Sequence, residues 1–268
     1  LVGTIITLPS PAIAEIYGLS GFDWLFVDLE HSAMNIADAQ AILQAAAPQT
    51  PCIIRVPAIE EVWFKKTLDI GAAGIIVPNV RTTKEAEQAV QFCRYPPAGT
   101  RSVGIARAQG YGDRFQEYLA SANDAIAVII QIEHIDAVQH IADIVRVPGI
   151  DSLFVGPYDL AASMGKMGRP ADPEVQDAIL RIKQAAEAIK RPLGIFAPTA
   201  EPAQHYIQTG YTLVTLGIYR FWARTRIRRY IWSSTTLGGD SFQYTGTGLE
   251  KLLGFLVAVV ILAFALGG

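Results

Sequence analysis

The chain has 268 residues, 51% of them hydrophobic, and a formal net charge of −3. This length fits one large catalytic domain, since a barrel of eight α/β units takes roughly 250 residues. The lysines and arginines of the first two hundred residues are scattered, which excludes a basic face for nucleic acid and favours a small-molecule substrate. Cys52 and Cys93 lack the spacing of a zinc or redox motif and are expected to be buried thiols. No export signal is recognised, so a cytoplasmic protein is predicted.

Eight short apolar runs recur along the chain, and most of them precede a stretch with helical periodicity. The predicted strands are residues 3–7, 24–28, 52–56, 74–77, 128–132, 152–156, 193–197 and 213–217, and the predicted helices are 37–47, 60–71, 83–93, 136–145, 173–190 and 202–209. Strands that alternate with helices indicate a parallel sheet covered by helices. Eight repeats favour closure, so the predicted class is α/β, a (β/α)8 TIM barrel formed by residues 1–217.

A polar insertion with several glycines and arginines, residues 99–123, interrupts this rhythm before the fifth strand. Long loops on a catalytic face are usually functional. Arg101, Arg107 and Tyr111 are therefore candidates for contact with an anionic or sugar-acid substrate, and solvated loop residues are the alternative interpretation.

The pattern changes again after residue 217. Residues 218–268 replace the expected last barrel helix with a basic segment, 219–230, a Gly- and Thr-rich passage and an apolar run, 252–266. The apolar run has no charge and no polar stripe, which favours a partial membrane helix over a buried soluble one. The arginines before it would lie on the cytoplasmic side. The C-terminal segment is thus expected to associate with a membrane.

Two carboxylates follow predicted strands, Glu133 after the fifth and Asp159 after the sixth. Parallel strands bring such residues to one rim of a barrel. Oxygen ligands of this kind suit Mg²⁺ or Mn²⁺, which keep positions open for water and substrate oxygens. The alternative is that both carboxylates cap helices. Gly156 and Pro157 favour the metal interpretation, because a glycine lets a ligand approach the backbone and the following amides can bind a carboxylate.

Further polar groups end the second and third strands. Arg55 can donate hydrogen bonds to a carbonyl oxygen that becomes an enolate, or else form a structural ion pair at the rim. His31 stands beside acids at a strand end, so a general-base role is weighed against a structural one. Asp28 and Glu30 alternate and are expected to point to opposite sides of the sheet. Asp69, at the end of the third predicted helix, is a candidate to orient His31.

Several motifs together carry a resemblance to a known family. They are residues 8–16, 21–31, 54–57, 68–71 and 99–104, Gln131-Ile-Glu133, and Val155-Gly-Pro-Tyr-Asp-Leu160. This ordered set resembles the HpcH/HpaI family of class II pyruvate aldolases over residues 1–217. The resemblance implies a homo-oligomeric TIM barrel that cleaves a 4-hydroxy-2-oxo acid reversibly to pyruvate and an aldehyde. It implies a divalent metal, Mg²⁺, Mn²⁺ or Co²⁺, as cofactor.

The resemblance also implies a role for each site residue. Glu133 and Asp159 would bind the metal, with Gln131 lining the site. Arg55 would stabilise the pyruvate enolate, and His31, paired with Asp69, would activate a metal-bound water for proton transfer. The substrate-binding residues would be Gln131, Gly156, Pro157 and Phe196. Phe196 stands where the family usually has an aliphatic residue, which narrows the pocket.

The end of the chain resembles a different family, the YjgN-type bacterial inner-membrane proteins, through residues 212–230 and 242–248. Residues 212–217 fit both families, as expected at the join of a gene fusion or chimera. Two alternatives to the aldolase are kept. One is an acyl-CoA lyase of the related citrate lyase beta-like group, which the lack of a basic patch for the nucleotide disfavours. The other is a non-catalytic membrane protein that carries a remnant barrel.

Overall fold

A computed structural model describes residues 1–46, 50–216, 236–237 and 240–241. The chain divides into two compact units, Leu1–Gly217 and Ile218–Gly268. In the second unit the described part is one antiparallel pair, β9 (Thr236–Leu237) with β10 (Asp240–Ser241). The predicted basic segment and apolar run lie outside the described residues. Within the described ranges, no helix is long and apolar enough to cross a membrane.

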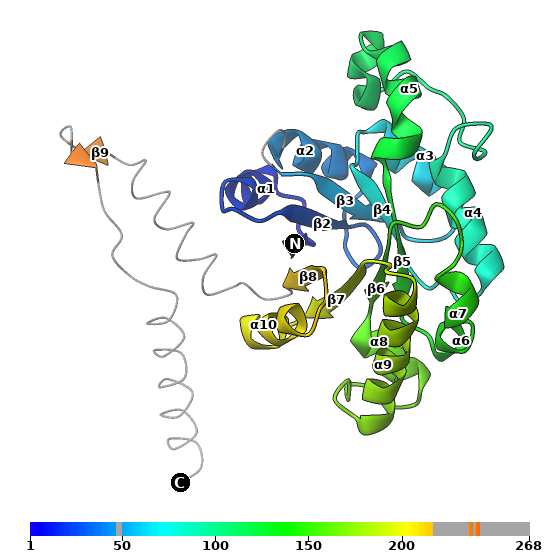
Figure 1. The fold of residues 1–268 in the computed structure, drawn as a ribbon. Coiled ribbons are helices and arrows are strands. Elements are labelled where there is room, and N and C mark those ends of the chain that lie inside the picture. The colour runs from blue at the N-terminus through cyan, green and yellow to red at the C-terminus, as the bar shows by residue number, and fades with distance from the viewer. Residues whose placement is uncertain (47–49, 217–235, 238–239, 242–268) are drawn as a thin grey trace. The chain divides into compact units, whose positions relative to one another are not determined.

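The first unit is a closed barrel of eight parallel strands, arranged in chain order (Figure 1). The strands are β1 (Val2–Ile6), β2 (Trp24–Asp28), β3 (Cys52–Arg55), β4 (Gly74–Val77), β5 (Ala127–Ile132), β6 (Ser152–Val155), β7 (Leu193–Ala197) and β8 (Leu213–Leu216). Pairing of β1 with β8 closes the barrel, with Val2 opposite Val214. The predicted (β/α)8 fold is confirmed.

Helices surround this barrel (Figure 1). They are α1 (Pro11–Gly18), α2 (Ile36–Ala46), α3 (Glu61–Asp69), α4 (Thr83–Cys93), the 3-10 helix η1 (Arg107–Gly112), α5 (Phe115–Ala125), α6 (Ile135–Gln139), α7 (Ile141–Ile144), α8 (Pro157–Ser163), α9 (Pro173–Ala188) and α10 (Ala200–Gln208). All six predicted helices are present, although the one over 136–145 is divided at His140 into α6 and α7.

The insertion is more ordered than expected. Its second half forms α5, at the top of the view in Figure 1, rather than part of a long loop. The sequence of α5 is rich in alanine and also contains leucine, glutamine and glutamate, all good helix formers. The short helices α1 and α8 were likewise missed, although each begins with proline at its first position, where the ring favours a helix start.

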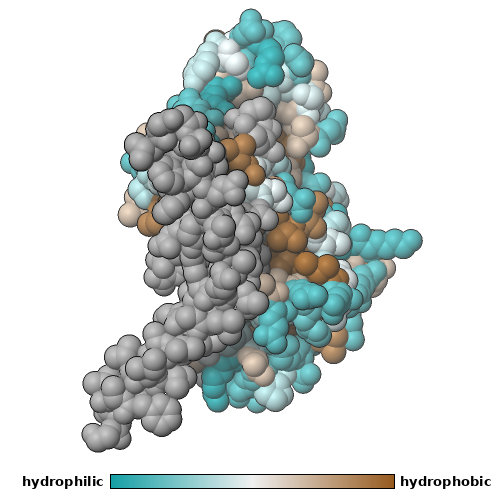
Figure 2. Space-filling model, turned by 90° about the vertical axis from the view of Figure 1, so that its left-hand side faces the viewer, coloured by the Kyte–Doolittle hydropathy of each residue, from teal (hydrophilic) through white to brown (hydrophobic). Residues whose placement is uncertain are grey.

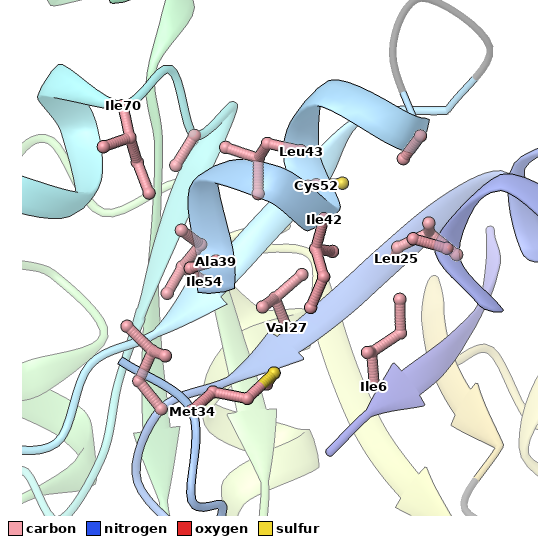
Figure 3. Packing of buried hydrophobic residues seen from close by; sticks show 14 residues of the cluster. Ile6, Leu25, Val27, Met34, Ala39, Ile42, Leu43, Cys52, Ile54 and Ile70 are labelled. Carbon is pink, nitrogen blue, oxygen red and sulfur yellow. The ribbon is translucent and has the colours of Figure 1, made fainter. Parts of the chain in front are cut away.

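Strand β2 shows how the sequence divides the core into two layers. Its five residues are all buried, and they alternate between the inside and the outside of the barrel. Trp24 and Phe26 belong to the cluster inside the barrel. Leu25 and Val27 belong to the cluster between the strands and the helices, shown in Figure 3. The same alternation turns the next inward residue, Asp28, toward the interior at the carboxyl end of the strand.

The cysteines and the surface agree with an ordinary globular barrel. Cys52 and Cys93 are free and buried, and burial raises the pKa of each thiol to about 12. Hydrophilic and hydrophobic residues are mixed on the face shown in Figure 2. Single exposed hydrophobic residues, such as Ile105 and Met167, are normal on such a surface.

Candidate active site

A cavity of about 280 Å³ opens at the carboxyl ends of the strands. Parallel strands end there together, which is where catalytic groups lie in barrels of this type. Seven of the nine predicted site residues line it, and these are His31, Arg55, Gln131, Gly156, Pro157, Asp159 and Phe196. Glu133 lies directly beside the cavity through its contact with Gln131. Asp69 is the predicted residue that the structure places elsewhere.

Arg55 is fixed by a bidentate contact with Asp28. Its Nε donates to Asp28 Oδ1 at 2.9 Å and its Nη2 donates to Asp28 Oδ2 at 2.7 Å. The third nitrogen, Nη1, lies 3.1 Å from Glu30 Oε2, and the guanidinium stacks over the Phe26 ring at 5.2 Å. Burial opposes the charge of Arg55, but its hydrogen bonds to Asp28 and the carboxylates around it outweigh burial and raise its pKa. The cation is therefore permanent and held in one orientation.

Asp28 is a site residue that the sequence reasoning did not select. Its Oδ1 also accepts the backbone N–H groups of Glu30 at 3.0 Å and His31 at 3.3 Å, so one carboxylate organises both Arg55 and the turn after β2. The expectation that Asp28 and Glu30 point to opposite sides was wrong, because both contact Arg55. Residues two positions apart in a strand face the same side, so the alternation that turns Asp28 inward also favours the same side for Glu30.

Glu133 is buried and held from two sides. Its Oε1 accepts the backbone N–H of Asn79 at 2.7 Å, and its Oε2 accepts the side-chain amide of Gln131. Burial raises the pKa of Glu133 to about 7, against the lowering effect of these hydrogen bonds, and the carboxylates of Glu30 and Asp159 raise it further. Asn79, which the sequence reasoning missed, adopts a left-handed conformation with φ of 55° to make this contact.

The oxygen atoms around Glu133 fit a hard divalent cation. The buried Oε1 of Gln131 has no hydrogen-bond partner. A Cβ at Gly156 would lie 2.8 Å from Glu133 Oε2, so only glycine leaves room for this carboxylate. Within the described part of the chain, no group of three or more His, Cys, Asp or Glu residues gathers to hold a metal. The candidate oxygen donors are the carboxylates of Glu133 and Asp159 and the amide oxygen of Gln131, and donors of this kind suit Mg²⁺ or Mn²⁺.

At the start of α8, fewer backbone N–H groups are free to bind an anion than expected. The N–H of Gly156 donates to Ile132 O at 3.1 Å, and Pro157 has no N–H to give. The first amides that a carboxylate can use are therefore those of Tyr158 and Asp159. Phe196, on β7, packs edge-on against Tyr158 at 6.2 Å between ring centroids and forms part of an apolar wall.

His31 and Asp69 do not meet within this chain. The His31 side chain is 65% exposed at the rim, and its Nε2 lies 3.7 Å from Glu30 Oε2. Helix α3 runs back from the carboxyl end of β3 toward the start of β4, so its last residue, Asp69, lies near the opposite end of the barrel. There Asp69 Oδ1 accepts a hydrogen bond from Arg101 Nη2 at 2.8 Å.

The insertion residues also have other partners. Arg101 is buried against Asp69, and Arg107 Nη1 donates to Ile70 O at 2.8 Å. Tyr111 is exposed. None of the three lines the cavity at the carboxyl ends of the strands.

A barrel with a buried, fixed arginine beside several oxygen donors is typical of an enzyme that handles an anionic, oxygen-bearing small molecule. Comparison with known proteins identifies the family of this enzyme. Residues 3–223 match the HpcH/HpaI aldolase/citrate lyase family, and the chain belongs to that family. The predicted resemblance is confirmed.

Named relatives support the same class. A 4-hydroxy-2-oxovalerate aldolase of Rhodococcus jostii is 40% identical over 81% of this chain and 84% of its own length. A 5-keto-4-deoxy-D-glucarate aldolase of Escherichia coli is 38% identical over 81% and 85%. Aldolases are carbon–carbon lyases, and this chain is an enzyme of that class.

Solved structures agree. A family member from Burkholderia cenocepacia is 36% identical, with a TM-score of 0.80 over 86% of this chain and 93% of that one. The citrate synthase SbnG is 29% identical, with a TM-score of 0.74 over 86% and 89%.

The end of the chain matches a second family. Residues 207–266 match bacterial proteins of unknown function (DUF898), so the two matches overlap over residues 207–223. This overlap contains the string 212–217 that was expected to fit both families.

Proposed function

We propose that this chain is a metal-dependent class II aldolase that cleaves 4-hydroxy-2-oxo acids reversibly to pyruvate and an aldehyde. The observation that carries the proposal is the placement of Arg55, which Asp28 holds bidentately in the same cavity as Asp159 and Gln131. The relatives named aldolases support the reaction type. Glu133 and Asp159 are proposed to bind the cation, with Mg²⁺ or Mn²⁺ favoured by the oxygen donors.

Arg55 is proposed to act on the C2 oxygen. When the bond between C3 and C4 breaks, its electron pair passes into the C2 carbonyl, and negative charge develops on that oxygen. Arg55 has five N–H groups, of which two bond Asp28 and a third faces Glu30. The remaining two can donate to the developing enolate without any reorientation, which is where electrostatic stabilisation contributes most. A bound divalent cation would add Lewis-acid stabilisation of the same charge.

His31 is proposed to move the protons. Cleavage requires the proton of the C4 hydroxyl to leave as the aldehyde forms, and the enolate then takes a proton at C3. His31 is the one histidine that lines the cavity among the described residues. Its exposure at the rim lets it exchange protons with solvent between the two steps.

The rest of the cavity would position the pyruvate half. The amides of Tyr158 and Asp159 are proposed to hold its carboxylate. Phe26, Phe154 and Phe196 supply an apolar wall for the methylene carbon that becomes the pyruvate methyl group. Phe196 makes this wall bulkier than an aliphatic residue would, so small 2-oxo acids are the expected donors.

A second candidate is lyase chemistry on an acyl-CoA, which the family description and the citrate synthase structure favour. Among the lining residues of the cavity, however, Arg55 is the single lysine or arginine, and Asp28 uses much of it. Nucleotide phosphates would need further cations, so the aldolase is the better fit. We further propose that the chain forms a homo-oligomer and that residues 218–268 associate with a membrane.

A pyruvate-release assay tests the function. The chelated protein is supplied with a panel of 4-hydroxy-2-oxo acids, with and without Mn²⁺, and pyruvate is measured. We expect release that depends on the cation and is lost in Arg55→Lys. Release at the same rate from thoroughly chelated protein would contradict the metal-dependent mechanism, and no release from any member of the panel would contradict the aldolase.

A further inference from the structure

The segment between β4 and α4 (residues 78–82) contains one residue with an uncommon backbone conformation. Asn79 has a positive φ of 55°, in the left-handed region that residues other than glycine seldom adopt. Among the described residues, Tyr111 and Lys190 share this feature, and neither lines the active-site cavity. Asn79 contacts Glu133, a proposed ligand of the cation. Residues in such sparsely populated conformations often cluster at functional sites, where the surrounding structure holds them in place.

The left-handed turn at Asn79 determines what its N–H group bonds. The parallel ladder between β4 and β5 ends with Val77 opposite Ile130. A chain that continued in the extended conformation would offer its amide groups to the backbones of the neighbouring strands. Instead, the N–H of Asn79 donates to Oε1 of Glu133 at 2.7 Å. Glu133 is 6% exposed, so this bond replaces hydration that burial removes.

Neighbouring contacts hold this turn in place. Nε of Arg81 donates to Asn79 Oδ1 at 3.1 Å. The N–H groups of Arg81 and Thr82 donate to Glu85 Oε2, at 2.8 and 2.9 Å. The hydroxyl of Thr82 accepts the N–H of Glu85 at 3.2 Å, which completes a capping box at the start of α4. The turn is therefore attached to the first residues of a helix.

The orientation of Glu133 matters because a carboxylate binds a cation through directed lone pairs. Its Oε2 accepts the side-chain amide of Gln131, and Asn79 fixes its Oε1. Loss of a hydrogen-bond partner behind a metal ligand typically weakens metal binding about 10–100-fold. Two cavities lie at this end of the barrel, the first lined by Arg55 and the second, of about 300 Å³, by Asn79. Because Asn79 does not line the first cavity, it reaches the cation through Glu133 rather than through the substrate.

We propose that Asn79 is a positioning residue for the cation: its left-handed backbone aims an N–H group at Glu133 and thereby sets the affinity of the site for a divalent metal. This inference rests on the proposed function, in which Glu133 binds the cation. It assigns the effect to the backbone of Asn79, because the N–H donates to Glu133 whereas the side-chain oxygen accepts from Arg81.

Two substitutions separate the backbone from the side chain. Both Asn79→Gly and Asn79→Val remove the side-chain amide, but glycine readily adopts a positive φ whereas a branched side chain disfavours it. Mn²⁺ alone is titrated into each chelated protein, without substrate, and the Kd is measured by calorimetry. We expect the Kd of Asn79→Val to exceed that of Asn79→Gly by about 10–100-fold.

Lys190 supplies the matched control. It is exposed, follows the end of α9 and has a φ of 58°. Lys190→Val introduces the same backbone strain away from the active-site cavity, so it should lower stability without changing the Kd for Mn²⁺. Circular dichroism checks that each variant is folded. Asn79→Ala, with a smaller side chain, takes the place of Asn79→Val if the latter does not fold.

Excess metal gives a second readout, because high concentration compensates for low affinity. Mn²⁺ in excess should restore hydrogen exchange at the pyruvate methyl group in Asn79→Val but not in Glu133→Gln. Equal Kd values for Asn79→Gly and Asn79→Val, or equal weakening by Lys190→Val, would overturn the inference. An unmodified chain that binds no Mn²⁺, or a Glu133→Gln variant that binds it normally, would contradict the proposed metal site and this inference with it.

Discussion

Two buried arginines, one near each end of the barrel, show how similar contacts serve different purposes. Arg55 and Arg101 each bind an aspartate and stack on an aromatic ring. Arg101 bonds Asp69 and the hydroxyl of Tyr118, at 2.8 and 3.2 Å, and lies 4.5 Å from the ring of Tyr95. Arg55 lines the cavity at the carboxyl ends of the strands, whereas Arg101 does not.

The difference lies in what surrounds each pair. Beside Arg55 stand Glu133, Asp159 and the unpaired amide oxygen of Gln131, which we propose as ligands of a cation. Two tyrosines, Tyr95 and Tyr118, stand beside Arg101. The bond from Arg101 to Asp69 connects the insertion to the end of α3. A buried ion pair therefore indicates a reaction centre only when it borders open space and further unsatisfied groups. The predictions below test this distinction.

The largest effect is expected at Glu133. Glu133→Gln keeps the shape of the side chain but removes the charge that would hold the cation. Activity should fall by at least the 10²–10³-fold that loss of one oxyanion donor costs, and added Mn²⁺ should not restore it. Steady-state kinetics measures this, with exposed Glu87→Gln as the control. Near-normal activity of Glu133→Gln after metal repletion would remove Glu133 from the site.

Arg55→Lys should come next. Lysine keeps a positive charge but lacks the planar group that binds Asp28 with two bonds and still faces the substrate. We expect kcat to fall about 10²–10³-fold, or roughly 2.7–4 kcal/mol. The loss should appear in both cleavage and pyruvate exchange. An unchanged kcat would mean that Arg55, like Arg101, has only a structural role, and would contradict the distinction between the two arginines.

Arg101→Lys should affect stability rather than chemistry. The substitution loses the bond to Tyr118 and the stacking on Tyr95, and we expect the free energy of unfolding to fall by about 1–3 kcal/mol. Urea denaturation measures this change. The kcat/KM per folded molecule should stay near that of the unmodified chain. A fall in kcat/KM as large as that of Arg55→Lys would show that the insertion takes part in the reaction.

The smallest effect is expected at the aromatic wall. Phe196→Leu removes ring volume from the first cavity and should admit a larger donor. One extra methylene in an apolar pocket changes selectivity by about 1–3 kcal/mol. The ratio of kcat/KM for 2-oxobutanoate to that for pyruvate should therefore rise about tenfold or more. An unchanged ratio would place Phe196 outside the donor pocket.

The sequence predicted the repeating parts of this molecule well and the local exceptions poorly. The eight strands follow from apolar runs of β-branched residues, and the barrel follows from their number. The insertion helix α5 was missed because its glycine- and arginine-containing surroundings dominated the pattern. Short helices such as α8 have too few turns to show a period.

The site was predictable where a strand end fixes a side chain. Arg55, Gln131 and Gly156 lie at or next to strand ends and meet at the cavity as expected. Asp28 and Asn79 were missed because their roles depend on a turn and on one left-handed residue. His31 and Asp69 do not pair within the chain. His31 follows the carboxyl end of β2, whereas Asp69 ends helix α3, which runs to the opposite end of the barrel. The positions of these two residues in the sequence do not by themselves reveal this distance in space.

Formation of the pyruvate enolate in the first cavity is the central claim, and deuterium exchange tests it most directly. The chain is incubated in D2O with pyruvate and Mn²⁺ and without any aldehyde, and loss of the methyl proton signal is followed by NMR. We predict steady exchange that chelation stops, that Mn²⁺ restores, and that Arg55→Lys loses while Arg101→Lys keeps. A folded, metal-supplied chain that exchanges no protons, or one in which Arg55→Lys exchanges at the normal rate, would contradict the claim.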